Sequence, residues 1–203
     1  MTAVETARSL FDRLDGFGAA AEPGGSFDRA AIEAIVDAGI YGASVPKEVG
    51  GLDLPLTEVV DVWAEIARAD GSIGWVSFAM DVAVAYFGAY LTDEGVADIF
   101  DGPLPWLAGQ YAPNGTATAD GDEWVVNGNY QFGSGIALAN MAGGGFLATP
   151  AGGGDPDYLF GCYPVDRAEL KGNWDVLGLQ GTQSMDYAPV SYTHLTLPTI
   201  CSV

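Results

Sequence analysis

The segment "TATADGDEWVVNGNYQFGSG", residues 116–135, contains three short runs of β-prone residues separated by residues that favour turns. Short runs bounded by Gly, Asn and Asp are typical of strands in an antiparallel sheet. Within the segment, Asn127-Gly128 favours a two-residue type I′ hairpin turn, because both residues tolerate a positive φ. The segment therefore predicts strand, turn, strand, turn and strand.

The sequence that follows keeps the same β character. Residues 141–165, "MAGGGFLATPAGGGDPDYLFGCYPV", predict two strands around a Gly-rich loop. Residues 174–190, "WDVLGLQGTQSMDYAPV", predict a further turn followed by a strand. The second half of the chain is therefore expected to form sheet structure.

The first half of the chain is predicted to be helical. Ser26 is placed to cap a helix that ends at Gly39, and Thr57 is placed to cap a second, amphipathic helix. A shorter helix is expected to begin at Thr92, where acidic residues follow and suit the positive end of the helix dipole.

One segment, residues 73–91, is apolar and close to the ~20 residues that a membrane-spanning helix requires. Asp81 lies at its centre, and no Lys or Arg closely borders it. These features favour a buried helix of a helical domain over a membrane span.

Helices followed by strands predict an α+β fold, with a helical domain over residues 1–105 and a β-barrel-like domain over residues 106–189. Lys and Arg number 7 against 27 Asp and Glu, giving a net charge of -20. Such a charge disfavours nucleic acid and membrane surfaces as partners. The two cysteines form no metal-binding pattern, and the N-terminus lacks the apolar core of a signal peptide. We expect a cytoplasmic protein without a metal site.

The usual catalytic constellations are missing from the sequence. His194 is its single histidine, so nucleophile–histidine pairs have no credible base before residue 190. No GxGxxG or GxxxxGK[ST] motif occurs. Composition and spacing alone therefore indicate an α+β domain and no particular reaction.

Four segments carry a family resemblance through their order along the chain: "VPKEVGG" at 45–51, "ARADGSIGWV" at 67–76, "WVVNGNYQFGSGIALANM" at 124–141 and "NWDVLGLQGTQSMDY" at 173–187. In this order they resemble the acyl-CoA dehydrogenase superfamily. The last two are most similar to its flavin-dependent monooxygenase branch, the oxygenase components of two-component aromatic hydroxylases. The resemblance covers roughly residues 26–190.

The resemblance implies a helical domain, a β-barrel-like domain that contacts the flavin ring, and a C-terminal four-helix domain that would supply the catalytic residues. It implies reduced FMN or FAD as cofactor, a separate flavin reductase as partner, a small-molecule substrate and a homotetramer. The flavin contacts that it implies are Phe132, Gly133, Ser134, Gln110, Tyr111 and Trp75.

Physical chemistry is consistent with these contacts. A flavin edge needs hydroxyl and backbone partners, and Ser134 supplies a hydroxyl between two glycines that permit a close approach. Structural interpretations stay open: "FGSG" as an ordinary strand end, Gln110 and Tyr111 as half-buried strand residues, and Trp75 as a core residue.

Three functions remain as alternatives: a reduced-flavin monooxygenase of an aromatic or other small organic substrate, an FAD-dependent acyl-CoA dehydrogenase, and a non-catalytic interaction module of the same fold. "YAPNGTAT", residues 111–118, replaces the loop that helps to hold acyl-CoA in the dehydrogenase branch. Gln180 replaces the Arg that is common in "GLRGT". The first of these departures favours the monooxygenase, and the second weakens any transfer of substrate specificity.

The last stretch, "VSYTHLTLPTICSV" at 190–203, matches nothing in the superfamily. Its residues can be back-translated into a string that resembles sequencing-adapter DNA. We therefore expect the natural sequence to continue differently after Pro189 and residues 190–203 to be non-native. The chain as written is then expected to be inactive, with a tail that makes few contacts or adds a strand to a sheet edge.

Overall fold

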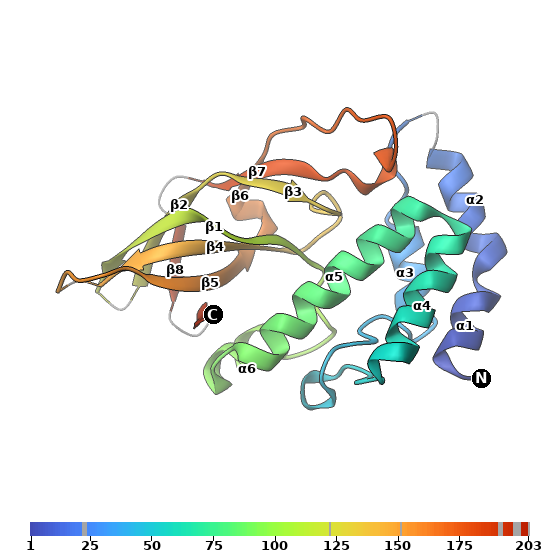
Figure 1. The fold of residues 1–203 in the computed structure, drawn as a ribbon, viewed down its shortest axis with the longest axis horizontal. Coiled ribbons are helices and arrows are strands. Elements are labelled where there is room, and N and C mark those ends of the chain that lie inside the picture. The colour runs from blue at the N-terminus through green and yellow to red at the C-terminus, as the bar shows by residue number, and fades with distance from the viewer. Residues whose placement is uncertain (22–23, 122, 151, 191–192, 197–199, 203) are drawn as a thin grey trace.

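The computed structural model describes residues 1–21, 24–121, 123–150, 152–190, 193–196 and 200–202 (Figure 1). Helices occupy the first half and strands the second, as predicted. The helices are α1 Ala3–Ser9, α2 Phe11–Ala21, α3 Ala30–Asp37, α4 Leu56–Ala69, α5 Gly71–Tyr90 and α6 Asp93–Ile99. Short 3₁₀ turns are η1 Lys47–Val49, η2 Val165–Arg167 and η3 Gln180–Thr182.

The strands divide into two sheets. They are β1 Leu107–Asp120, β2 Glu123–Gly128, β3 Tyr130–Gly133, β4 Met141–Thr149, β5 Asp157–Pro164, β6 Ala168–Leu170, β7 Met185–Pro189, β8 Thr193–Thr196 and β9 Ile200–Ser202. Within the described residues the larger sheet has the order β8-β2-β1-β4-β5-β9, and the smaller has the order β3-β7-β6. The β1–β4 pair is parallel and the other pairs are antiparallel.

The larger sheet is strongly curled. β8 pairs with β2 at one edge and β9 pairs with β5 at the other. The chain from Thr196 to Ile200 can span at most about 14 Å. Six strands side by side in a flat sheet would separate the outer two by about 24 Å. The two edges must therefore approach each other, giving the half-barrel seen in Figure 1. The tail therefore adds a strand to each edge of this sheet, β8 to one and β9 to the other, as expected.

The predicted hairpin at Asn127-Gly128 is wrong. Both residues lie inside β2, paired with Thr116 and Gly115 of β1, and neither has a positive φ. The β1–β2 turn instead contains Gly121, whose φ is 62°. A Cβ on Gly128 would lie 2.9 Å from the ring of Tyr130, so this glycine serves packing. β3 then leaves the larger sheet and pairs with β7.

Two predicted helix caps are also corrected, whereas the third is confirmed. The N-cap residue of α3 is Arg29, and the carboxylate of Asp28, not Ser26, accepts a hydrogen bond from the helix amide of Ala30 at 2.9 Å. α4 begins directly after Pro55, whose fixed φ suits a helix start, so Thr57 lies within the first turn. Thr92 caps α6 by accepting a hydrogen bond from Gly95.

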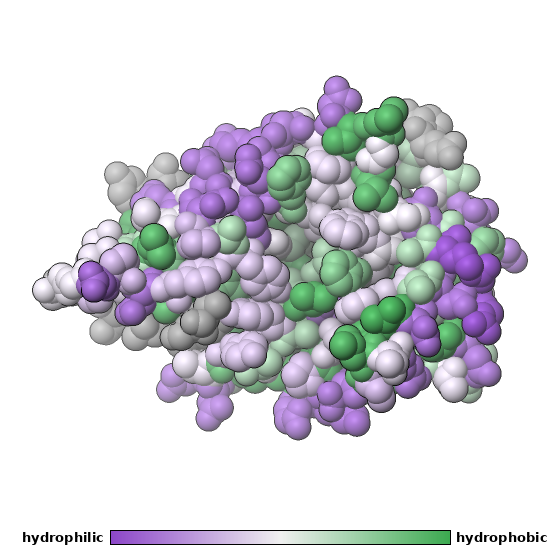
Figure 2. All heavy atoms as spheres, in the orientation of Figure 1, coloured by the Kyte–Doolittle hydropathy of each residue, from purple (hydrophilic) through white to green (hydrophobic). Residues whose placement is uncertain are grey.

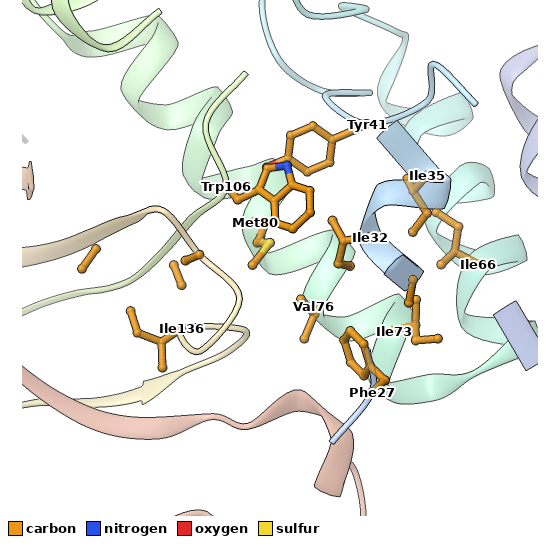
Figure 3. Packing of buried hydrophobic residues seen from close by; sticks show 14 of the residues in the cluster. Phe27, Ile32, Ile35, Tyr41, Ile66, Ile73, Val76, Met80, Trp106 and Ile136 are labelled. Carbon is orange, nitrogen blue, oxygen red and sulfur yellow. The ribbon is translucent and has the colours of Figure 1, made fainter. Parts of the chain in front are cut away.

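Helix α5 forms the centre of the molecule and joins its two halves. On one side it packs against α4, where a Cβ on Gly74 would lie 2.4 Å from Ala67. On the other it contacts β1 and η3. Figure 3 shows Ile73, Val76 and Met80 of α5 within a cluster of buried apolar side chains. α5 has the length and composition of a membrane span, and about 50% of that apolar window is buried inside the protein.

The glycines of β4 create space for aromatic rings. Gly143–Gly145 lie within the strand, and a Cβ on Gly144 would lie 2.4 Å from the ring of Tyr130. Tyr130 stacks on Tyr187, with centroids 5.2 Å apart. The Tyr130 hydroxyl donates to the carbonyl of Gly145, and that of Tyr187 donates to Gly143. The Tyr130 ring therefore lies directly over Gly144, where a side chain would displace it.

Candidate functional site

Trp75 and Ser134 meet where α5 approaches the end of β3. The indole Nε1–H of Trp75 donates to Ser134 Oγ at 2.9 Å. Trp75 is 46% exposed and Ser134 is 9% exposed, so the contact joins the surface to the interior. Two residues predicted from separate parts of the sequence are thus in direct contact.

Behind Ser134, further hydroxyls continue the contact into the protein. Ser134 Oγ lies 2.8 Å from Ser184 Oγ, which in turn lies 2.7 Å from Thr182 Oγ1. Thr182 Oγ1 donates to the carbonyl of Leu179 at 2.9 Å. Ser184 and Thr182 are almost completely buried. We call this set, Trp75, Ser134, Ser184, Thr182 and the Leu179 carbonyl, the hydroxyl chain.

The turn around η3 holds the inner end of the hydroxyl chain. Leu179 and Gln183 adopt left-handed backbone conformations, with φ of 56° and 45°. The amide of Gly135 donates to the carbonyl of Thr182 at 2.8 Å, which ties the turn to the residue after Ser134. Trp174 Nε1 also donates to the Leu179 carbonyl, at 3.1 Å. These bonds give Trp174 and the turn a structural role at the inner end of the hydroxyl chain.

Gly133 and Gly135 are needed for packing within the protein. A Cβ on Gly133 would lie 2.9 Å from the ring of Tyr187, and one on Gly135 would lie 2.7 Å from Met80 and Val76. Gly135 also has a φ of 75°, in the region that favours glycine. The space beside both glycines is filled by the protein's own side chains, and a flavin contact by Gly133 stays a prediction.

Phe132 lies at the surface beside the hydroxyl chain. It is 63% exposed, has a φ of 58° and meets Trp174 edge to face, with ring centroids 6.3 Å apart. A positive φ is uncommon outside glycine and points to a constrained local backbone. Phe132 therefore presents a free aromatic face two residues from Ser134.

Gln110 lies beside β3 through its side chain. Its Oε1 accepts bonds from the amide of Gln131 and from Asn114 Nδ2, both at 3.0 Å. Its backbone amide donates to the hydroxyl of Tyr187 at 2.9 Å. Through these bonds Gln110 connects the irregular part of β1 to Gln131, the residue before Phe132.

Tyr111, in contrast, belongs to a different contact. Its ring stacks on Phe160 with centroids 4.8 Å apart, and its hydroxyl donates to the carbonyl of Val82 at 3.3 Å. Val82 lies seven residues after Trp75 on α5, which corresponds to about 10 Å along the helix. The structure thus separates Tyr111 from the contact between Trp75 and Ser134.

An apolar groove of about 410 Å³ opens beside Trp75. Its lining is formed by α4, α5 and Leu179, and comprises Val60, Trp63, Ala64, Ala67, Gly71, Gly74, Trp75, Phe78 and Leu179. Figure 2 shows exposed apolar residues over the helices and over the turn that leads to η3. Trp63 and Trp75 both use their indole N–H inside the protein, so neither offers it to the groove.

Asp81 is a buried carboxylate in the middle of α5. It is 2% exposed and accepts bonds from the amide of Ser44 at 3.2 Å and from Trp63 Nε1 at 3.0 Å. Burial raises the pKa of this carboxyl from 3.8 to about 6, against the lowering effect of these donors. Asp81 was visible in the sequence as the single charge within the apolar segment.

Sequence reasoning did not find Ser184, Thr182, Trp63 or Phe78 as members of this region. Single hydroxyls in "GTQSMDY" form no recognisable pattern, and Trp63 and Phe78 have the spacing of ordinary core residues. Among the residues whose side chains the structure describes, none is a histidine, and no cluster of three His, Cys, Asp or Glu could hold a metal. The catalytic residues stay unassigned.

A helical domain that packs through one central helix onto a curled mixed sheet defines the acyl-CoA dehydrogenase-like class of fold. Residues 4–95 match the acyl-CoA dehydrogenase N-terminal domain. The first half of the chain is therefore similar to this domain, in agreement with the sequence resemblance.

Several relatives of the chain are flavin-dependent monooxygenases, and one that matches a shorter stretch is a (2S)-methylsuccinyl-CoA dehydrogenase. The chain is 33% identical over 172 residues to an indole-3-acetate monooxygenase of Acinetobacter baumannii, covering 80% of this chain and 43% of the relative. It is 29% identical over 154 residues to the oxygenase component of an FADH2-dependent resorcinol hydroxylase of Rhizobium sp., covering 75% of this chain and 37% of the relative. The chain thus spans less than half the length of these relatives.

A solved structure of the same kind is the dibenzothiophene monooxygenase of Paenibacillus sp. A11-2, in complex with FMN and indole. It superposes with a TM-score of 0.85 at 25% identity, covering 100% of this chain and 53% of that one. The similarity includes both the helical half and the sheet.

Proposed function

We propose that the protein is the oxygenase component of a two-component flavin-dependent monooxygenase, acting on an aromatic or other small organic substrate. The observation that carries this proposal is the 33% identity, over 172 residues, to a monooxygenase of an indole compound. A resorcinol hydroxylase and an FMN-bound monooxygenase among the relatives support the same chemistry.

The residues around Ser134 fit a flat aromatic cofactor. Phe132, two residues from Ser134, and Trp75, which bonds to its hydroxyl, both expose aromatic surface, which suits a ring with polar atoms along its edge. The side-chain amide nitrogen of Gln110 donates to no described residue, so it remains available as a donor near β3.

Reduced flavin, FMN or FAD, would supply the chemistry by activating O2 for insertion into the substrate. The residues of this chain would bind and orient the ring: Ser134 at its polar edge, Phe132 and Trp75 at its surface. The apolar groove would keep water away from one side of the region. Gln110 is proposed as an edge contact. Tyr111 is proposed only to stabilise β1 through its contacts with Phe160 and with Val82 of α5.

The acyl-CoA dehydrogenase alternative is less well supported. The segment that replaces the acyl-CoA loop, residues 111–118, lies within β1; residues 115–118 pair with β2 and β4, and the register to β4 shifts between Gln110 and Gly115. The sequence of this segment differs from that of the acyl-CoA loop, which disfavours a thioester substrate. We also propose, from the resemblance, a separate reductase as partner, a homotetramer and a cytoplasmic location.

The test uses the full-length protein with FMN or FAD, a flavin reductase and ¹⁸O2. We expect O2 consumption only with reduced flavin, and incorporation of labelled oxygen into an indole or phenol substrate. Reduction of bound flavin by an acyl-CoA without a reductase would contradict the proposal and favour the dehydrogenase.

A further inference from the structure

Three aromatic rings follow one another along the apolar groove, and hydrogen bonds fix both ends of this row. Trp63 meets Phe78 edge to face, with ring centroids 4.9 Å apart, and the centroids of Phe78 and Trp75 are 5.4 Å apart. The indole N–H of Trp75 donates to Ser134. The indole N–H of Trp63 donates to the carboxylate of Asp81 at 3.0 Å. We call Trp63, Phe78 and Trp75 the aromatic row.

The lining of the groove defines the kind of ligand that fits it. The described residues that line it carry no charge, and its volume of about 410 Å³ lies in the range of small-molecule sites. Aromatic side chains pack favourably against another flat ring. A carboxylate ligand would lose its hydration there without a cation to replace it. The groove therefore fits a neutral aromatic ring, such as the aromatic part of the substrate in the proposed function.

Asp81 joins three segments of the helical half behind the aromatic row. It lies on α5, accepts the bond from Trp63 on α4, and accepts the amide of Ser44, in the segment after α3, at 3.2 Å. It is buried, and none of the ion pairs in the described part of the chain includes it. A buried carboxylate without a cationic partner costs stability, so this arrangement points to a role other than stability.

Trp63 lies between the groove and a second, much smaller space. It lines the groove and also a cavity of about 10 Å³, whose lining includes Asp81, Tyr41 and Ser77. Such a cavity is about the size of one water molecule. An indole released from Asp81 has this space to shift into, which would draw it away from Phe78. The bond to Asp81 therefore keeps the Trp63 ring on the groove side.

We infer that Asp81 is a positioning residue, which holds Trp63 in the aromatic row and so sets the affinity of the apolar groove for the aromatic ring of the substrate. The inference rests on the proposed function, because it takes that substrate to be the occupant of the groove. It adds to that function a determinant of substrate binding that contacts no ligand itself, since Asp81 does not line the groove.

Protonation of Asp81 should weaken its bond to Trp63. A carboxylate accepts a hydrogen bond more strongly than a neutral carboxyl group does. Burial raises the pKa of Asp81 to about 6, so the carboxylate forms as pH rises through this value. The groove should therefore bind its ligand more tightly above about pH 6 than below it.

The surroundings of Asp81 contribute no competing titration in this range. Burial raises the pKa of the Tyr41 phenol above its ordinary value of 10, so this group stays neutral. The other side chains that face Asp81 carry no group that titrates near pH 6; they are Ser44 from the segment after α3, Trp63 and Ile66 from α4, and Ser77 from α5.

The test measures the dissociation constant of indole for the full-length protein between about pH 5 and about pH 7.5. Indole is neutral throughout this range, so a change with pH belongs to the protein. We expect indole to bind about fivefold to tenfold more tightly at the higher pH, as for one hydrogen bond strengthened. Asp81→Asn, which cannot ionise, should remove this dependence. Asp61→Asn, on the exposed face of α4, should retain it.

Two further variants locate the effect within the groove. Trp63→Phe keeps an aromatic ring and removes the N–H that donates to Asp81, so indole should bind more weakly and independently of pH. Ala64→Leu places a larger side chain in the groove and should weaken indole binding about tenfold while the pH dependence stays.

The outcomes separate this inference from the proposed function. Indole binding that is independent of pH in the unaltered protein, or a pH dependence that survives in Trp63→Phe, overturns Asp81 as a positioning residue. Indole binding that Ala64→Leu leaves unchanged, or that is absent at every pH, overturns the groove as the site. Each of these results leaves the monooxygenase proposal standing, because incorporation of labelled oxygen tests it separately. Absence of labelled product from a protein that binds indole as expected overturns the monooxygenase proposal alone.

Discussion

The two ends of α5 join the helical half to the sheet in different ways. Near its C-terminus, Phe87 stacks on Phe160, which stacks on Tyr111, with both centroid separations 4.8 Å. Near its N-terminus the connection to the end of β3 includes a directed bond from Trp75 to Ser134, beside the packing of Val76 and Met80 against Gly135. Aromatic stacking contributes a large buried area but tolerates small shifts, whereas a hydrogen bond contributes less energy and demands geometry. One end thus holds the halves together, and the other sets their alignment at the candidate site.

The largest effect is expected at the aromatic end. Phe160→Ala removes the ring in the middle of the stack and leaves a cavity, so the free energy of unfolding should fall by about 3–5 kcal/mol. Chemical denaturation measures this loss. Phe160→Leu is the matched control and should cost less than about 1.5 kcal/mol. A loss below about 1 kcal/mol for the alanine variant would break the contrast between the two ends.

Asp81, between the two ends, should make stability depend on pH. Because its pKa is raised from 3.8 to about 6, the folded chain binds more protons than the unfolded chain between these values. The free energy of unfolding should therefore fall as pH rises from about 4 to about 6. Relative to the wild type, Asp81→Asn should gain about 2 kcal/mol between pH 4 and pH 7.

Urea denaturation at each pH measures this difference, and Asp61→Asn on the exposed face of α4 controls for the loss of a surface carboxylate. A constant difference between Asp81→Asn and the wild type across this range would show that the buried carboxyl titrates normally.

Ser134→Ala sharpens the comparison at the N-terminal end of α5. We expect flavin binding to weaken by about 1–3 kcal/mol, because a buried partner is lost, while stability falls by only about 1 kcal/mol. Isothermal titration and thermal denaturation give the two quantities. If stability fell as much as in Phe160→Ala while flavin binding stayed unchanged, Ser134 would be a purely structural residue.

The smallest effect is expected for Trp75→Phe. This change keeps an aromatic side chain and removes the N–H that donates to Ser134. Since Trp75 is 46% exposed, stability should fall by about 0.5–1 kcal/mol. A shift in the melting temperature larger than that of Ser134→Ala would show that the indole acts through packing.

The sequence predicted the fold better than the site, for physical reasons. Hydrophobic periodicity reports burial directly, so α4, α5 and the order of helices before strands could be predicted. The turn at Asn127-Gly128 could not, because the ring of Tyr130 determines the use of Gly128. A local turn preference was overridden by a tertiary contact.

The site was predicted only in part because its members are far apart in the chain. Trp75 and Ser134 were proposed separately, each from family resemblance. In the structure Trp75 Nε1 lies 2.9 Å from Ser134 Oγ. Tyr111 adjoins Gln110 in sequence, yet its ring and hydroxyl contact Phe160 and α5 instead. Ser184 and Thr182 join Ser134 through hydroxyl contacts that no residue pattern encodes.

The glycines of β4 have a consequence for sequence variation. Gly143–Gly145 and Gly152–Gly154 are both runs of three glycines, but substitutions should be tolerated very differently in the two runs. In the first run, a Cβ on Gly144 would meet Tyr130 at 2.4 Å, and one on Gly145 would meet the backbone of Tyr111 at 2.2 Å. In the second run, no atom lies within 4 Å of a Cβ. Natural variants and random mutagenesis libraries should therefore be depleted at the first three codons and diverse at the last three, with Gly153 and Gly154 limited only by their positive φ.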